Sequence, residues 1–340
     1  MEEPPTSGGP WASVAVEGGY SCGLTQDGAA YCWGAGTSGT VPSPVLPTLR
    51  FQSLAATQGL ACAVTTDGVT WCWAVGPGAV PTPAAQHPTF RFRQIIAGRN
   101  NICALSMGAT VLCWSRIDAE PRTPTALPGG HSFTSLMQGT DRFCGVTTAG
   151  VALCWGDLAN WSAVSIEVVA NGAVAVWSNG AQACVLLADG SAACRGSNRY
   201  GQLGDGTRTD RATFAPVSGG HRFRTLASSG WSTCGITEAG AAHCWGVAMT
   251  CLPADGAGPP VSDCETFGGA PLGAAGANAA PVAWMERYRL RGLALHPGHS
   301  CAVTTEGSAY CWGANSAGEL GLGTQSRGTA VPQRVVDPKG

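Results

Sequence analysis

The stretch that decides the fold is CGLTQDGAAYCWG, from Cys22 to Gly34, and it returns near the end of the chain as CAVTTEGSAYCWG, from Cys301 to Gly313. Each copy places two cysteines ten residues apart. Seven such pairs occur along the chain: Cys22/Cys32, Cys62/Cys72, Cys103/Cys113, Cys144/Cys154, Cys184/Cys194, Cys234/Cys244 and Cys301/Cys311. Their first cysteines are separated by 40, 41, 41, 40, 50 and 67 residues. A period in this range is typical of propellers and other repeat arrays.

The segment between the paired cysteines is predicted to be a β-hairpin. An aliphatic residue such as Leu24 stands two positions after each first cysteine, and this alternation is typical of a strand with one buried face. Six of the seven repeats then have a glycine six residues after the first cysteine, Gly28 in the first repeat, whereas the third repeat shifts it to Gly108. As the last residue of a three-residue loop, such a glycine would adopt the left-handed conformation. Counting outward, Cys22 faces Cys32 at a cross-strand distance that a disulfide accepts.

Other positions repeat in phase with the hairpin. A tryptophan follows the second cysteine in six repeats, and an aromatic residue stands eleven positions before the first cysteine in five. The residue after the first cysteine is glycine or alanine in six repeats, so we expect close packing on that face. Each unit therefore has an earlier strand, the hairpin, and a fourth strand between units, as in Ala215–Val217. We predict an all-β fold, a seven-bladed β-propeller of four-stranded antiparallel blades with a cross-strand disulfide in each blade.

The two ends of the chain suggest how the ring closes. The repeats open near Trp11, in the middle of a unit, and residues 331–336 resemble the missing connecting strand. We therefore expect the C-terminal strand to complete the first blade. The alternative is an open solenoid, which needs polar capping repeats that the sequence does not show.

The expected domain organisation is simple. Residues 1–10 are predicted to be a flexible leader, and residues 11–340 a single propeller. The 67-residue spacing places an insertion at 247–287 in the sixth unit, whose first part Cys251 and Cys264 are expected to staple.

Two segments carry a family resemblance. GSNRYGQLGDGT (Gly196–Thr207) and GANSAGELGLGT (Gly313–Thr324) resemble the signature of the regulator of chromosome condensation repeat, as does the last hairpin. The resemblance extends over residues 11–336 and implies a seven-bladed propeller. The best-known member of that family is a nucleotide-exchange factor for the small GTPase Ran that also binds chromatin, and a bacterial β-lactamase inhibitor protein is similar in fold. Five units here lack the GQLG segment, and a single lysine among the basic residues fits a bacterial source.

Composition excludes several classes of protein. Hydrophobic residues make up 44% of the chain and charged residues only 12%, which excludes an intrinsically disordered chain. No apolar run approaches the ~20 residues that span a bilayer. The net charge of −2 argues against nucleic acid as a partner, since nucleic acid requires a basic surface.

The sixteen cysteines bear on the compartment. An even number at disulfide spacing indicates an oxidising, extracytoplasmic location: periplasmic, cell-surface or secreted. The alternative is that the cysteines are reduced and serve as small buried apolar residues. The first residues, Met1–Pro5, lack the charge and apolar pattern of a signal peptide.

The sequence nominates no catalytic site. It contains no nucleophile elbow, phosphate-binding loop or paired carboxylates of a glycosidase, so we predict no enzyme and no cofactor. His296 and His299 lack a third metal ligand. Asp205 and Asp210 flank a glycine-rich turn and suggest either calcium or, more simply, a solvated turn.

Candidate binding residues come from comparing the repeats with one another. The position two before each first cysteine varies freely, and it follows a glycine-bearing loop, so these residues should surround one face of the disc. The predicted partner-binding residues, with two preceding neighbours, are Tyr20, Leu60, Asn100, Asn101, Arg142, Gln182, Trp231 and His299. The alternative is neutral drift in exposed loops. The insertion 247–287 is a second candidate, either as a docking arm or as a tolerated loop expansion.

Three function classes remain. The leading hypothesis is an extracytoplasmic, non-catalytic propeller that binds another protein as a scaffold, an accessory subunit of an envelope assembly or an inhibitor. The second is a carbohydrate-binding or carbohydrate-cleaving propeller, since tryptophans stack on sugars. The third, a guanine-nucleotide exchange factor, rests on the family resemblance.

Overall fold

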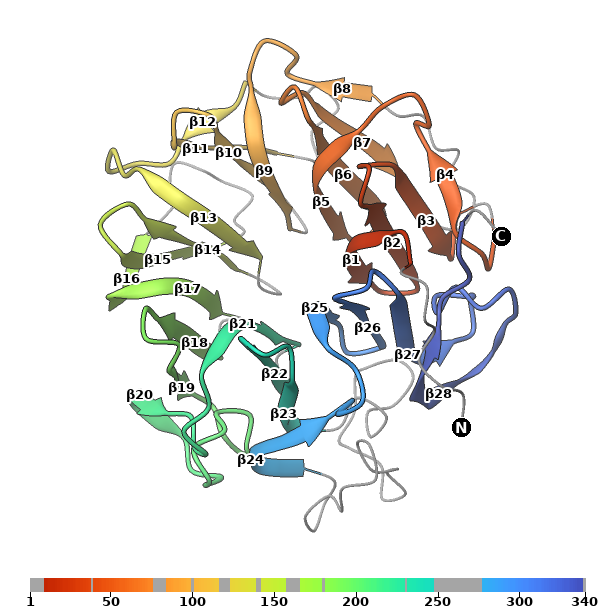
Figure 1. Cartoon of the computed structure of the whole chain (residues 1–340). Coiled ribbons are helices and arrows are strands. Elements are labelled where there is room, and N and C mark those ends of the chain that lie inside the picture. The colour runs from red at the N-terminus through yellow and green to blue at the C-terminus, as the bar shows by residue number, and fades with distance from the viewer. Residues whose placement is uncertain are drawn as a thin grey trace.

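The computed structural model describes residues 9–37, 39–75, 84–98, 101–115, 123–138, 142–156, 166–178, 181–229, 231–247 and 277–338. These residues form seven antiparallel sheets of four strands each, arranged as blades around a central axis (Figure 1). They contain no helix, and so none that is long and apolar enough to cross a membrane. The prediction of an all-β, seven-bladed propeller is confirmed.

The strands follow one another blade by blade. Blade 1 holds β1 (Trp11–Glu17), β2 (Tyr20–Thr25), β3 (Ala30–Gly34) and β4 (Ser43–Val45), and blade 2 holds β5 (Phe51–Thr57), β6 (Leu60–Thr65), β7 (Thr70–Ala74) and β8 (Ala84–Gln86). Blade 3 holds β9 (Phe92–Ala97), β10 (Asn101–Ser106), β11 (Val111–Ser115) and β12 (Thr125–Ala126), and blade 4 holds β13 (Phe133–Gln138), β14 (Arg142–Thr147), β15 (Val151–Gly156) and β16 (Ile166–Asn171). Blade 5 holds β17 (Ala173–Ser178), β18 (Gln182–Leu187), β19 (Ala192–Gly196) and β20 (Arg211–Pro216). Blade 6 holds β21 (Phe223–Ser228), β22 (Ser232–Thr237), β23 (Ala242–Val247) and β24 (Ala277–Trp284), and blade 7 holds β25 (Leu290–Leu295), β26 (His299–Thr304), β27 (Ala309–Asn315) and β28 (Ser326–Arg334).

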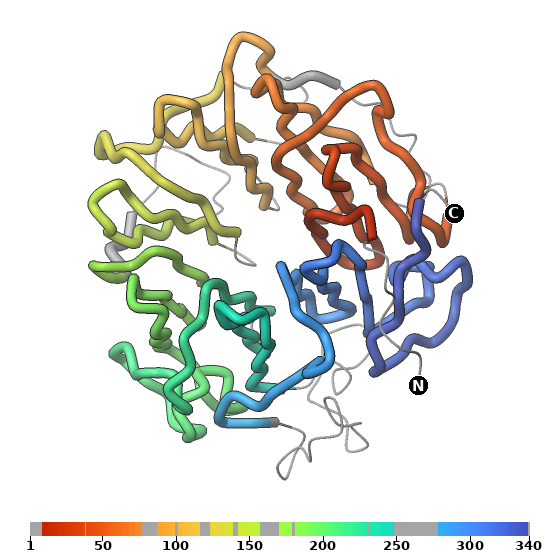
Figure 2. The backbone as a smooth tube through the Cα atoms, in the orientation of Figure 1, coloured from red at the N-terminus to blue at the C-terminus, as the bar shows by residue number. Residues whose placement is uncertain are grey.

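Within each blade the chain runs outward. The first strand lies nearest the axis and the fourth at the rim, which the backbone trace shows as a repeated path from centre to edge (Figure 2). The predicted fourth strand at Ala215–Val217 corresponds to β20, which ends one residue earlier, at Pro216.

The cysteine hairpin has the predicted register. Cys22 pairs directly with Cys32 across β2 and β3, and the two are joined by a disulfide with their Cα atoms 4.1 Å apart. The same bond joins Cys62–Cys72, Cys103–Cys113, Cys144–Cys154, Cys184–Cys194, Cys234–Cys244 and Cys301–Cys311. Cys251 and Cys264 lie outside the described residues, as do residues 1–8 of the predicted leader.

The hairpin turn depends on one backbone conformation. Gly28 has φ of 83° and ends a loop in which the Thr25 N–H donates to the Ala29 carbonyl at 2.9 Å. In the third repeat the left-handed position is occupied by Ala109, with φ of 67°, and Gly108 precedes it. The displaced glycine therefore leaves a non-glycine residue in a region that L-residues disfavour.

The small residue after each first cysteine makes room for an aromatic ring. A Cβ atom built on Gly23 would lie 2.6 Å from the Trp11 ring, and one on Gly235 would lie 2.4 Å from the Phe223 ring. The fifth blade exchanges the two volumes, with Ala173 in the aromatic position and Val185 in the small one, and both are buried in one cluster. The expectation of close packing on this face is confirmed.

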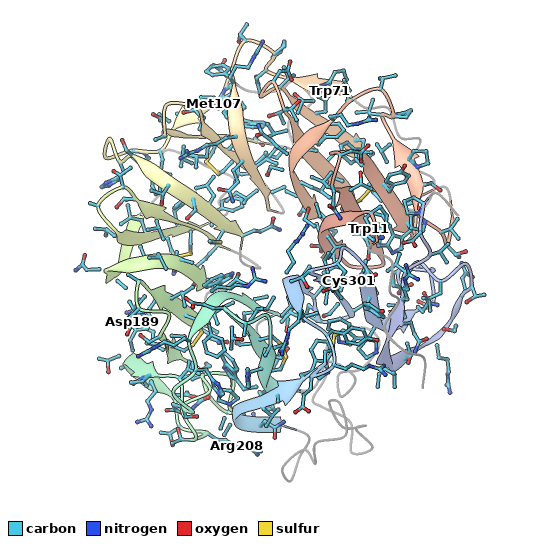
Figure 3. All side chains as sticks on the ribbon, in the orientation of Figure 1. Trp11, Trp71, Met107, Asp189, Arg208 and Cys301 are labelled. Atoms are coloured by element: carbon cyan, nitrogen blue, oxygen red, sulfur yellow. A yellow bond between two sulfur atoms is a disulfide. The ribbon has the colours of Figure 1, made fainter. Side chains whose placement is uncertain are left out.

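The ring closes differently from the prediction. The C-terminal strand β28 pairs with β27, so it completes blade 7, and the expectation that it completes the first blade is wrong. Blade 1 already has its fourth strand in β4, which pairs with β3. Blades 7 and 1 meet through side-chain packing and loop contacts: Trp11 and Cys301 share a buried cluster and lie close together in Figure 3.

Candidate functional site

The two faces of the disc differ in how uniform their loops are. One face carries the short turns between the second and third strands, such as Thr25–Ala29, together with the links from one blade to the next; we call it the constant face. The other carries the connections between the first and second and between the third and fourth strands; we call it the variable face. Its connections between third and fourth strands differ in length, as 35–42 in blade 1 and 197–210 in blade 5 show. A surface that differs from blade to blade is the better candidate for specific recognition.

The predicted ring of binding residues lies at the start of each second strand, on the variable face, but it is largely not exposed. Tyr20, Asn101, Gln182 and His299 are each at most 4% accessible, while Leu60, Arg142 and Trp231 are half-buried. Asn100 lies outside the described residues. The expectation that this whole ring presents an exposed surface is therefore wrong for its four buried members.

These buried side chains join neighbouring blades. The Tyr20 hydroxyl contacts the carbonyl oxygens of Thr57 and Leu60 in blade 2, both at 2.8 Å. The Gln182 amide of blade 5 donates to the Thr233 hydroxyl of blade 6 at 3.1 Å. The residue at this position therefore differs between junctions partly because different polar partners meet there.

The junction of blades 7 and 1 contains the most polar of these bridges. His299 Nε2 lies 2.8 Å from the Ser21 hydroxyl, which donates to the Glu319 carbonyl at 2.9 Å. Both side chains are buried, Ser21 completely, so a substrate has no access to this serine–histidine pair. Nearby, His296 Nε2 lies 3.7 Å from a Glu17 carboxylate oxygen. Burial lowers the pKa of His299 to about 3, with the neighbouring His296 adding to the effect, and burial lowers the pKa of His296 to about 4.

The two retained signature loops make a second kind of bridge. In blade 5 the Gln202 carbonyl accepts the Trp245 indole N–H of blade 6 at 2.9 Å. In blade 7 the Glu319 carbonyl accepts the Trp33 indole N–H of blade 1 at the same distance. By contrast, the indole N–H groups of Trp73, Trp114, Trp155 and Trp312, which follow blades without the signature, have no hydrogen-bond partner among the described residues.

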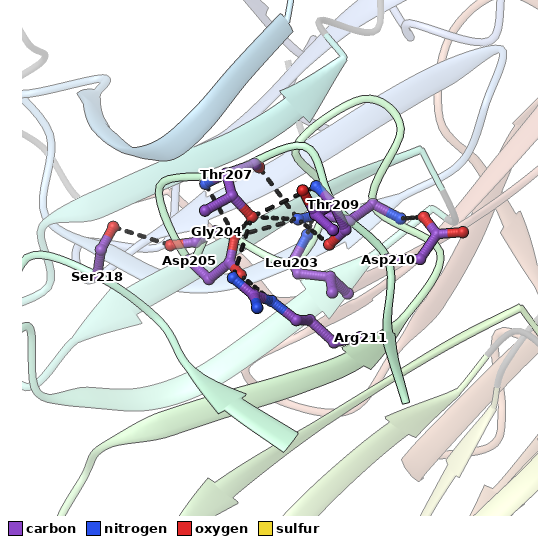
Figure 4. Close-up of polar contacts among 9 residues, drawn as sticks. Leu203, Gly204, Asp205, Thr207, Thr209, Asp210, Arg211 and Ser218 are labelled. Carbon is purple, nitrogen blue, oxygen red and sulfur yellow. Dashed lines mark hydrogen bonds and ion pairs between the residues drawn. The ribbon is translucent and has the colours of Figure 1, made fainter. Parts of the chain in front are cut away.

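An asparagine and an aspartate shape the blade 5 loop. The Asn198 amide donates to Asp205 and to the Thr207 carbonyl, and Asp205 also accepts from Arg211 at 2.7 Å (Figure 4). Burial opposes ionisation of Asp205, but hydrogen bonds from Thr207, Arg211 and Asn198 outweigh it and lower its pKa. The carboxylate that suggested calcium is thus held by donors of its own loop, and Asp210 accepts from the Asn198 N–H.

The exposed part of this loop meets Trp231. Tyr200 and Trp231 pack edge to face with ring centroids 5.2 Å apart, and the Arg199 guanidinium lies 5.7 Å from the Tyr200 ring centre. Both rings are half-buried and Arg199 is exposed. We call Arg199, Tyr200 and Trp231 the aromatic cluster. Trp231 was among the predicted binding residues, whereas Arg199 and Tyr200 were not. The signal for these two was present in the sequence, because the second signature segment has Ser316 and Ala317 at the same places.

A central cavity of about 520 Å³ runs between the inner strands of all the blades. Its polar groups are largely used between blades: the Gln94 amide donates to the Leu136 carbonyl at 2.7 Å and accepts from the Leu136 N–H at 2.8 Å. No group of three metal-ligating side chains occurs among the residues that the structure describes.

Comparison with known proteins agrees with this architecture. The family model of the Regulator of chromosome condensation (RCC1) repeat matches residues 297–319, which include the hairpin and signature of blade 7. This segment of the chain is therefore similar to one RCC1 repeat. A curated relative of the chain, the ultraviolet-B receptor UVR8 of Arabidopsis thaliana, is 30% identical over 166 residues, which are 48% of this chain and 34% of UVR8. The matched part is thus about a third of that relative's length.

Solved structures show the same fold at low identity. Prp20p from Saccharomyces cerevisiae, described with its binding to Gsp1p and histones, superimposes on this chain with a TM-score of 0.71 at 18% identity, covering 93% of this chain and 88% of Prp20p. The ectodomain of the Arabidopsis thaliana receptor kinase ACR4 gives 0.56 at 18% identity, covering 95% and 100%. At these identities the likeness concerns the fold alone.

Proposed function

We propose that this protein is a non-catalytic propeller that docks another protein through its variable face, with the aromatic cluster at the centre of the contact. The observation that carries the proposal is the packing of Trp231, Tyr200 and Arg199 into a half-exposed group on that face. Tryptophan, tyrosine and arginine are the residue types enriched at interface hot spots.

The surroundings of the cluster support the same face. The Val247 N–H donates to the Trp231 carbonyl at 3.0 Å, so the chain leaves blade 6 beside Trp231 as it enters the predicted insertion. Most of that insertion lies outside the described residues. We propose that 247–287 extends the docking surface, because a long connection at this place adds contact area next to the cluster.

We further propose that the protein works outside the cytoplasm, as a scaffold, an accessory subunit of an envelope assembly or an inhibitor. Seven disulfides within the blades indicate an oxidising environment. The likeness in fold to a receptor-kinase ectodomain supports an extracellular setting for such a propeller.

The test is purification from the native host under non-reducing conditions, with mass spectrometry of the copurifying proteins and affinity measurements on the partner so identified. Trp231→Ala and Tyr200→Ala should each weaken binding about 30-fold, as expected for hot-spot residues. Met107→Ala is the matched control, since Met107 is 53% accessible and lies in a turn of the constant face. Equal affinities for all these variants would overturn the proposal.

Nucleotide exchange on a small GTPase is the second candidate. Its support is the likeness to Prp20p, which was studied with Gsp1p, over 93% of this chain. Release of labelled guanine nucleotide from a GTPase of the native host should be accelerated if this candidate is right. An unchanged release rate at saturating propeller would remove it.

A further inference from the structure

A second cavity, of about 540 Å³, lies at the outer edge of blade 7, where β28 ends near the constant face. Its walls are the link between blades 6 and 7, the ring of Tyr310, and the chain from Val331 to Asp337. The aromatic cluster, by contrast, lies on the variable face of blades 5 and 6. The size of this cavity is within the ~300–1,000 Å³ of small-molecule sites.

The cavity is positively charged. Arg287, Arg334 and Asp337 line it, and the Arg334 guanidinium pairs with the Asp337 carboxylate at 2.8 Å. Arg287 has no ion pair among the described residues, and its guanidinium lies 5.0 Å from the Tyr288 ring centre. An exposed guanidinium that lines a cavity and forms no ion pair is available to an external anion.

Two phenols form the floor. The rings of Tyr288 and Tyr310 are 4.6 Å apart, and Tyr310 is only 5% accessible. Burial raises the pKa of Tyr310, and its hydrogen bond with Tyr288 raises it further, while Arg334 and Arg287 act in the opposite direction. The net direction keeps this phenol protonated and therefore able to donate.

Among the described residues, only blade 7 has a tyrosine both two positions before the start of its first strand and one position before its second cysteine. The same two positions hold His221 and His243 in blade 6, and His131 and Leu153 in blade 4. Strand β28 also lies at the rim, hydrogen-bonded to β27 only, so its outer edge offers backbone groups next to the cavity. The cavity is thus lined by guanidinium groups, phenol hydroxyl groups and backbone groups of β28.

We infer that this cavity binds a small organic acid that also carries hydroxyl groups, such as a uronic acid. The guanidinium groups of Arg287 and Arg334 hold the carboxylate, because their fork of N–H donors matches its two oxygens. The phenols, the Gln333 amide and the edge of β28 provide hydrogen bonds to the hydroxyl groups. The inference is independent of the proposed protein-docking role, which uses other residues on the opposite face.

The test is calorimetric titration of the intact chain with glucuronate, with glucose as the uncharged counterpart and inorganic phosphate as the bare oxyanion. Glucuronate should bind, glucose should not, and phosphate should bind at least tenfold more weakly. Arg287→Gln and Arg334→Gln should each weaken glucuronate binding about tenfold or more, as for the loss of a charged hydrogen bond.

The matched control is Arg222→Gln, because Arg222 is likewise an exposed arginine paired with an aspartate, Asp189, at 3.4 Å. It should bind glucuronate as the unchanged protein does. Thermal unfolding of each variant shows that it is folded, and Arg287, being exposed, can be replaced without disturbing the core. Glucuronate binding no tighter than glucose, phosphate binding as tight as glucuronate, or an Arg287→Gln variant of full affinity would each overturn the inference.

Discussion

Ala109 shows what single residues contribute to this repeat. Ala109 stands at the turn position where the six other repeats have a glycine, and it adopts φ of 67° there. The displacement of the glycine to Gly108 therefore leaves backbone strain at Ala109. The cysteine register was predictable at this scale, because an alternating strand and a turn glycine determine which residues face each other. The burial of the ring residues was not, because it depends on blades that are 40 or more residues apart.

Ala109→Gly should raise the free energy of unfolding by about 0.5–1 kcal/mol, since the relief of left-handed strain exceeds the added entropy of the unfolded chain. Gly28→Ala should lower it by at least about 1 kcal/mol, because Gly28 has φ of 83° and a Cβ there would lie 2.8 Å from the Phe51 carbonyl oxygen. Urea unfolding of both variants measures the difference. A destabilised Ala109→Gly variant would contradict this account of the turn.

The buried tryptophans allow a matched comparison of one hydrogen bond. Trp33 donates to the Glu319 carbonyl at 2.9 Å, whereas the equivalent Trp73 N–H has no partner among the described residues. Trp33→Phe should therefore cost about 1 kcal/mol more than Trp73→Phe, since both lose similar volume but only the first loses a bond. Equal losses in chemical denaturation would show that the signature loop adds nothing to the junction.

At the scale of the element, the chain uses its variable positions to join blades. Tyr20, Gln182 and His299 each bond to a neighbouring blade, and two signature loops reach the tryptophan of the next one. A position that varies between repeats was interpreted from sequence as a partner surface. In a closed ring, the same variation also arises where junctions between blades use different polar partners.

The histidines at the junction of blades 7 and 1 make stability depend on pH. Burial in the folded state lowers the pKa of His299 to about 3 and that of His296 to about 4, from the ordinary histidine pKa of 6.5. Between pH ~6.5 and pH ~4, these histidines bind protons in the unfolded chain but not in the folded chain. Their contribution to stability is therefore fully present above pH ~6.5 and declines as the pH falls toward 4. Thermal unfolding from pH 7 to pH 4 should show this decline.

His299→Gln, which keeps a donor for Ser21, should flatten the decline although it lowers stability at pH 7. Glu238→Gln is a control, because Glu238 is exposed in a hairpin turn of the constant face. An unchanged pH dependence in His299→Gln would contradict the assignment to this junction.

At the scale of the whole molecule, the ring is closed without a covalent bond between its ends among the described residues. All seven described disulfides lie within blades, and blade 7 packs on blade 1 through Trp11, Trp33 and Leu320. The sequence predicted a strand at 331–336 but assigned it to the wrong blade. Blades 7 and 1 are neighbours in the ring, so a strand at either place satisfies closure. The assignment depends on β4, which already fills the fourth place of blade 1. That strand is only three residues long and contains Pro44, so the sequence hardly predicts it.

The candidate site was predicted in part. Trp231 was recognised through its repeat position, but Arg199 and Tyr200 become a surface only when the signature loop of blade 5 folds over the start of blade 6. The disulfides within the blades were predicted from the cysteine spacing, because that spacing brings each pair within bonding distance.

The most direct test of the central claim, that the variable face docks a protein, is site-specific photo-crosslinking in the native host. The chain has a single lysine, Lys339, so a photoreactive phenylalanine at position 200 is preferable to amine-directed reagents. The account predicts a covalent product with one protein when the photoreactive residue replaces Tyr200, and none when it replaces Met107 on the constant face. No product from position 200, or the same product from both positions, would contradict it.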